Sequence, residues 1–324
     1  MIALPDNAKI VGLPSATSGL RRTGSFDAPN GLTHLGHNGE SQNFDVIPGL
    51  PVTASPSPAP SDPYFGDVVL LMHFNGAQGG TVFTDDSKYD HSFTAVGNAV
   101  TDTSNPKFGS ADLYTGAASG YASLDTGQSL TPFDIGVGDV EFTLECWVNI
   151  ASPSSTQAYI SRGGGLAGWN GTNGNQWMLF SLNNNLYWQW WSSFGVQTIY
   201  APYSSLPGGS FSANTWHHIA VTFEILIGSS VTRLYFDGVH VGQNYGSYVS
   251  TTAADKVRVG GGPYGGYSIN GHMDDVRITS GVARYTGTGS FTVPSEEFPN
   301  GTTSFITTES GDYLVNENGN NLIA

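Results

Sequence analysis

Alternation of apolar and polar residues marks the clearest strand in the chain, residues 140–150 (VEFTLECWVNI). Every second residue there is apolar: Val140, Phe142, Leu144, Cys146, Val148 and Ile150. A period of two over this length predicts a β-strand with one face toward a core. Cys146 shares the apolar face, so we expect a small buried hydrophobe rather than a reactive thiol.

Further short runs of apolar and aromatic residues follow one another along the chain, separated by turn residues. We expect strands at 68–74, 176–182, 186–191, 215–224, 231–242, 256–262 and 272–278. The NNN triplet at 183–185 predicts a hairpin, and the Asp237-Gly238 pair is typical of a tight turn. Short strands at regular spacing are typical of a β-sandwich or barrel.

The composition agrees with an all-β protein and argues against nucleic acid and membranes as partners. The 43 Gly and 17 Pro among 324 residues leave little room for helices. A formal net charge of −15 repels phosphate groups, so we expect no nucleic-acid partner. No apolar run approaches the roughly 18 residues of a membrane helix, so we expect no membrane insertion. A single cysteine leaves no internal disulfide.

Changes in composition divide the chain into four parts. Residues 1–47 are Gly-rich and polar, and 48–64 form a Pro/Ser linker of extended geometry. Residues 65–299 contain the predicted strands, and 300–324 form a tail in which ESGDYLV is echoed by ENGNNLI. The first residues, MIALPDNAKI, lack a basic stretch followed by an apolar one, so a secretory signal is not expected.

A series of motifs in residues 65–299 resembles a known family. FGDVVLLMHFNG, KFGSADLYTGAASGYASL, LYFDGVHVG and NGHMDDVRITSGVARYTG occur in this order. Together they resemble the laminin-G-like, concanavalin A-like jelly roll, in the form common in bacteriophage and environmental bacterial surface proteins. The resemblance implies an all-β, two-sheet antiparallel jelly-roll sandwich with the first and last strands adjacent, here with an extended N-terminal arm and a short C-terminal β tail. It also implies binding of glycans or proteins, and a calcium ion in many members.

Two acidic pairs are the candidate metal ligands. Asp274 shares the period-two face of Val276 and Ile278, which places a carboxylate on the expected core side, next to Asp275. Asp85 and Asp86 lie in a loop after the first strand. A buried carboxylate needs a donor or a cation, so these four residues could hold calcium, a hard cation that prefers oxygen ligands. The alternative is that they accept hydrogen bonds and cap loops. The histidines show no spacing typical of a zinc cluster, so we expect ordinary hydrogen-bonded side chains.

An aromatic cluster is the candidate glycan site. Trp188 and Trp190 share one face of LYWQWW, and Gln189 and Trp191 share the other with Tyr187. Aromatic rings can stack on sugar rings while amides bind the hydroxyls. Three further rings in Gly-rich loops could join them: Trp169, Tyr264 and Tyr267. The alternative is that most of these rings belong to the core or to a subunit interface.

These features predict a virion structural or appendage protein that displays a non-catalytic, lectin-like domain. Its arm would bind other virion proteins, its jelly roll would bind host-surface or environmental glycans, and we expect a homo-oligomer on the virion surface, made in the host cytoplasm. One alternative is a purely structural decoration subunit. A glycoside hydrolase is the minor alternative, because Glu141 and Glu145 on one strand lie about 13 Å apart, too far for a catalytic pair.

Overall fold

The computed structural model describes most of the predicted domain. It covers residues 62–301 except 118–119, 164–175, 193–194, 247–255 and 263–266, and also the short antiparallel pair β1 (His34–Leu35) and β2 (Ser41–Gln42). The compact unit that holds the sandwich runs from Asp62 to Thr302, slightly wider than the predicted 65–299. Nearly all of the predicted arm, linker and tail lies outside the described residues.

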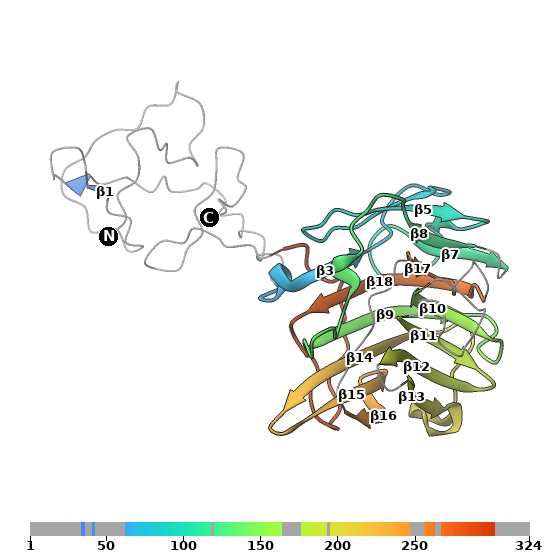
Figure 1. The fold of residues 1–324 in the computed structure, drawn as a ribbon. Helices are drawn as coiled ribbons and strands as arrows, with labels where there is room; N and C mark the ends of the chain where they lie inside the picture. The colour runs from blue at the N-terminus through green and yellow to red at the C-terminus, as the bar shows by residue number, and fades with distance from the viewer. Residues whose placement is uncertain are drawn as a thin grey trace, which may run out of the picture. The chain divides into compact units, whose positions relative to one another are not determined.

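Two antiparallel sheets face each other in this unit, which confirms the all-β jelly-roll sandwich (Figure 1). Sheet I has the order β13 (Gly195–Pro202), β12 (Asn185–Ser192), β11 (Trp177–Leu182), β10 (Gln157–Arg162), β17 (Val257–Val259), β8 (Tyr121–Leu124), β5 (Ser92–Val96), β4 (Val82–Thr84). Sheet II has the order β16 (Val239–Tyr245), β15 (Ser229–Phe236), β14 (Trp216–Leu226), β9 (Phe142–Ile150), β18 (Asn270–Ser280), β7 (Asp112–Ala117), β6 (Val100–Asp102), and β3 (Val68–Met72) also pairs with β18. The first strand of the domain therefore lies beside its last one, as expected.

Helical structure in the described part is limited to single 3₁₀ turns. These are η1 (Phe65–Asp67), η2 (Thr131–Phe133), η3 (Tyr203–Ser205) and η4 (Pro207–Gly209). None of these described helices is long or apolar enough to span a bilayer.

The core lies between the sheets and follows the period-two pattern of β9. Phe142, Leu144, Cys146, Val148 and Ile150 are all fully buried in it, as predicted, and burial raises the pKa of the Cys146 thiol. Val140 precedes the strand and is exposed.

The outer face of β9 is buried as well, because residues 281–301 fold back over sheet II. Tyr285 and Phe291 of this segment stack with ring centroids 3.7 Å apart. The hydroxyl of Tyr235 on β15 donates to the Gly287 carbonyl at 2.7 Å. The GVARYTG motif is therefore a packing element of the fold.

Both predicted turns are present. Asn183 and Asn184 have φ of 50° and 58° between β11 and β12, and Asp237 and Gly238 have φ of 47° and 76° between β15 and β16. Left-handed conformation at both turn positions is typical of two-residue hairpins, and Asn, Asp and Gly adopt it at least cost. A Cβ on Gly238 would lie 2.2 Å from the Phe291 carbonyl oxygen, so only glycine fits there.

A β-bulge at Asp275 reorganises the last strand. Met273 is in the core and Asp274 pairs with Trp147, whereas Arg277 pairs with Glu145, so one extra residue is inserted between them. Asp275 has a φ of 48°, a conformation uncommon for residues other than glycine. The prediction that Asp274 shares the core face of Val276 was wrong, because the bulge reverses the alternation at this point.

Candidate functional site

The outer face of sheet I carries neighbouring rows of aromatic and polar side chains. Tyr187 pairs with Phe180 on β11 and with Tyr200 on β13, with ring centroids 4.9 and 5.8 Å away. Gln189, two residues further along β12, donates from Nε2 to the Thr198 hydroxyl at 3.2 Å. Tyr200 is 59% exposed, and Tyr187 and Gln189 are half-buried. Rings beside an amide and a hydroxyl are therefore open to solvent on this face.

Trp191 extends this surface beyond Gln189. It is half-buried on the same face of β12 and pairs with Val196 of β13. Because residues two apart in a strand are about 7 Å apart, Tyr187 and Trp191 stand on either side of Gln189. We call Tyr187, Gln189, Trp191 and Tyr200 the outer aromatic face.

Trp188 and Trp190 are not part of this surface, so their prediction as ligand-binding rings was wrong. They are 0% and 3% exposed and lie in the core. Trp188 stacks on Trp177 with ring centroids 5.8 Å apart and contacts Phe142 of the opposite sheet. Burial of these apolar rings between the two sheets removes them from any ligand in solvent.

Three further rings were predicted to join this surface: Trp169, Tyr264 and Tyr267. Tyr267 is 38% exposed, while Trp169 and Tyr264 lie outside the described residues. Arg258 of β17 and Ser161 of β10 pair across this face and donate to the carbonyls of Gly163 and Gly261, each at 2.9 Å. Residues 163 and 262 are the last described residues before the gaps at 164–175 and 263–266.

Three of the four carboxylates predicted to hold calcium, those of Asp85, Asp274 and Asp275, already accept hydrogen bonds from the protein. Asp85 accepts the backbone N–H groups of Leu71, Ser87 and His91 and a further bond from His91 Nδ1 at 2.6 Å. Donors thus already point at both of its oxygens. Asp86 is the exception: its side chain is half-buried and accepts no hydrogen bond from the described residues, and burial raises its pKa.

Asp274 and Asp275 act together as a joint between segments. Asp274 accepts the N–H groups of Lys107, Phe108 and Asp275 at 2.8 to 3.0 Å. Asp275 accepts from His73 Nδ1 at 2.6 Å and from the Phe298 N–H at 2.9 Å. These hydrogen bonds connect the bulge to three other segments, at residue 73, at residues 107–108 and at residue 298. They correspond to the alternative in which the carboxylates accept hydrogen bonds and cap loops. Calcium binding by the protein stays a prediction.

The hydrogen bond between His73 and Asp275 predicts that the fold loses stability at alkaline pH. Burial alone would lower the pKa of His73, but the hydrogen bond and charge of Asp275, with Asn300 and Glu297, raise it to about 9. Because this pKa is higher in the folded than in the unfolded state, protonated His73 stabilises the fold. The stabilisation is complete below pH 6.5 and is lost as the pH rises through about 9. We expect the thermal midpoint of the native chain to fall between pH 6.5 and about 9, and His73→Gln to reduce that fall.

His240→Gln is the control, because burial lowers the pKa of His240, so this side chain stays neutral over the same pH range. Equal pH profiles for native chain and His73→Gln would contradict the assignment.

Glu145 is held inside an ion-pair network and is not presented to a substrate. It accepts from Arg277 Nη2 and the Tyr285 hydroxyl, both at 2.7 Å, and from His218 Nε2 at 3.2 Å. Glu141 accepts the N–H of Ile225. Glu141 and Glu145, the pair considered for a hydrolase, therefore both form hydrogen bonds that stabilise the fold.

A cavity of about 400 Å³ is a second candidate for a binding site. It is lined by Asp67, Val69, Lys88, Tyr89, Ser129, Thr131, Pro132, Asp134 and Ser280. Tyr89 is 41% exposed, with Lys88 Nζ 5.2 Å from its ring centroid. It offers a single ring, whereas the outer aromatic face offers three.

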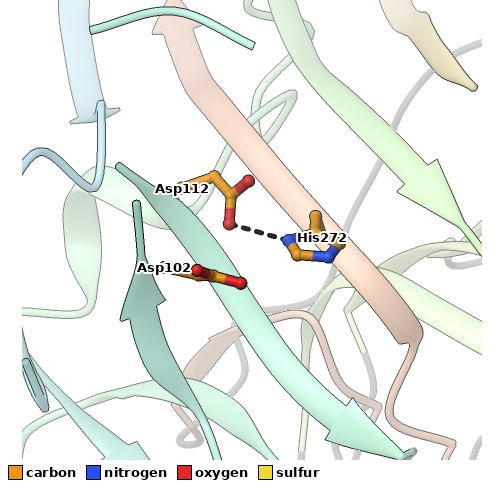
Figure 2. A group of neighbouring side chains, drawn as sticks. All are labelled: Asp102, Asp112 and His272. Atoms are coloured by element: carbon orange, nitrogen blue, oxygen red, sulfur yellow. Dashed lines mark hydrogen bonds and ion pairs between the residues drawn. The ribbon is translucent and has the colours of Figure 1, made fainter. Parts of the chain in front are cut away.

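Sequence reasoning missed a cluster on sheet II formed by Asp102, Asp112 and His272 (Figure 2). His272 Nδ1 and Asp112 Oδ1 are hydrogen-bonded at 2.9 Å. Burial raises the pKa of Asp112; burial would also raise that of Asp102, but hydrogen bonds from Ser104 and the charge of His272 lower it. Asp102 and Asp112 lie on consecutive strands, but His272 is 160 residues beyond Asp112, and only the pairing of β18 with β7 brings it to them.

Comparison with known proteins places the sandwich in a family. Solved structures similar to the chain include receptor-binding domains of botulinum neurotoxins: the C/D mosaic serotype (13% identity, 73% of this chain and 49% of that chain, TM-score 0.46) and serotype C1 (14% identity, 77% and 56%, TM-score 0.47). The chain spans about half the length of these structures. No curated protein matches it significantly. A laminin G-type family model, described as the concanavalin A-like lectin/glucanases superfamily, matches residues 115–284, more than half of the chain. The chain therefore belongs to the concanavalin A-like lectin/glucanases superfamily.

Proposed function

We propose that the sandwich is a non-catalytic carbohydrate-binding module whose binding surface is the outer aromatic face. The observation that carries this proposal is the exposure of Tyr187, Trp191 and Tyr200 around Gln189. Aromatic faces bind the apolar face of a sugar ring, and the amide between them can bind hydroxyl groups. The burial of Glu145 in the ion-pair network favours binding over hydrolysis.

Glycan binding should depend on the outward rings and not on the fold alone. We expect Tyr187→Ala and Trp191→Ala each to weaken binding about tenfold, since a lost ring contact costs roughly 1.5 kcal/mol. Thermal midpoints should stay close to that of the native chain, because both side chains are half-buried on the surface. The measurement is a glycan array on the full chain, followed by calorimetric titration of the best ligand.

Tyr89→Ala is the matched control, because it removes an exposed ring that lines the cavity and is not part of the outer aromatic face. If Tyr89→Ala abolished binding and the two β12 variants did not, the cavity would be the site. Silence of the native chain on a broad array would favour a purely structural subunit.

We further propose that the module is displayed on a virion, with residues 1–47 binding other virion proteins and several copies acting together. The support is the motif series NGHMDDVRITSGVARYTG, which is similar to the form found in bacteriophage proteins. Weak single sites gain strength when many copies bind one surface. Loss of the protein from purified particles after deletion of 1–47 would support this role, and an unchanged copy number would contradict it.

A further inference from the structure

Three side chains that can bind metals meet on the outer face of sheet II. Asp102 on β6 and Asp112 on β7 are directly paired in the register of the sheet, and His272 lies on the neighbouring strand β18. One potential ligand atom from each lies within 4.8 Å of the others, the single such group among the described residues. Figure 2 shows the two carboxyl groups beside the imidazole ring.

Asp112 is the member of the cluster with an unsatisfied oxygen. Asp112 is 0% exposed, and its Oδ2 has no hydrogen-bond donor among the described residues. An unpaired buried carboxylate oxygen costs free energy. Two carboxylates paired directly across strands also repel each other. In the described part of the chain, the only ion pair formed by Asp112 is with His272, a side chain that is charged only when protonated.

We propose that Asp102, Asp112 and His272 bind a divalent first-row transition metal ion of the zinc class. Such ions accept mixed imidazole and carboxylate ligands, whereas calcium prefers six or more oxygens. Two ligands bonded at about 2.1 Å to one tetrahedral ion lie about 3.4 Å apart, so His272 Nδ1 and Asp112 Oδ1, now hydrogen-bonded at 2.9 Å, would separate by about 0.5 Å and release their shared proton when the ion binds. The ion would also neutralise the buried oxygen that lacks a donor.

Neighbouring residues orient the three ligands and leave one side open. The rings of Tyr114 and Trp216 lie 4.8 and 6.5 Å from that of His272. Ser104 donates from its N–H and its hydroxyl to the two oxygens of Asp102, each at 3.0 Å. The side chain of His272 is 20% exposed and Asp102 is only partly buried, so water can complete the coordination.

Calorimetric titration of the chelator-treated full chain, prepared without a histidine tag, tests the proposal. We expect one Zn²⁺ to bind per chain, and Asp102→Asn and His272→Gln each to weaken binding by more than about tenfold. Asp102 is on the solvent side, so its variant should fold even if substitution of buried Asp112 does not. Cobalt(II) added in place of zinc should give a visible absorption band that both variants lose.

His240→Gln is the matched control, since it removes a histidine from β16 of the same sheet and should leave zinc binding unchanged. The proposal is overturned if the native chain binds no zinc at millimolar concentration, or if both cluster variants bind as tightly as it does. Calcium binding with equal affinity at these residues would overturn the choice of a transition metal.

Discussion

Trp188→Ala is expected to lower the free energy of unfolding by about 3–5 kcal/mol. Trp188 is fully buried between the sheets, where it stacks on Trp177 and contacts Phe142. Removing the indole leaves a large cavity that rigid strands on both sides cannot fill by collapse. Denaturant unfolding of the full chain, followed by tryptophan fluorescence and by circular dichroism, measures the loss.

Trp191→Ala provides the comparison, because it removes the same side chain from the opposite face of the same strand. Trp191 is half-buried, so its loss should cost less than about 1.5 kcal/mol. The pair of variants thus separates core from surface on β12. If Trp188→Ala were as stable as Trp191→Ala, the assignment of the two faces would be incorrect. Reduced glycan binding by Trp188→Ala would follow from unfolding rather than from a lost contact.

The strands could be predicted from the sequence because their patterns were local. The period of two in β9 identified its core face, and Asn183-Asn184 and Asp237-Gly238 identified hairpins whose backbone those residues favour. The face of β12 could not be chosen in this way. In LYWQWW both faces are aromatic, and the side that packs inward depends on Trp177 and on the opposite sheet.

The candidate sites depended on contacts that the sequence pattern does not contain. The bulge at Asp275 adds one residue to β18, so counting alternate positions from Val276 placed Asp274 on the wrong face. Two of the three N–H groups that Asp274 accepts come from residues 107 and 108, far away in sequence. In the same way, Asp102 and His272 are separated by most of the domain and meet only through strand pairing.

Glu145→Gln is expected to destabilise the fold by about 3–5 kcal/mol, because it leaves a buried arginine without its closest charge partner. Burial would raise the pKa of Glu145, but the charge of Arg277 and hydrogen bonds from His218 and Tyr285 hold that pKa well below its usual range. Glu145 is therefore ionised in the folded chain. In the same network Arg277 Nη1 donates to Asp62 Oδ2 at 3.1 Å. Stability from this group should be present above about pH 4.5 and be lost at lower pH.

A double-mutant cycle separates the ion pair from the shape of the site. Arg277→Met in the Glu145→Gln background should restore part of the loss, because it removes the charge left unpaired while keeping most of the side-chain volume. Glu224→Gln is the matched control: Arg233 is as buried as Arg277, but the side chain of Glu224 is 16% exposed whereas that of Glu145 is 0% exposed, so this variant should lose less stability than Glu145→Gln. Urea unfolding at pH 7 is measured for the native chain, Glu145→Gln, Arg277→Met, the double variant and Glu224→Gln. If Glu145→Gln and Glu224→Gln lowered the free energy of unfolding equally, the ion pair of Glu145 and Arg277 would not be the main interaction that holds residues 281–301 on sheet II. The stacking of Tyr285 on Phe291 would then be the main interaction.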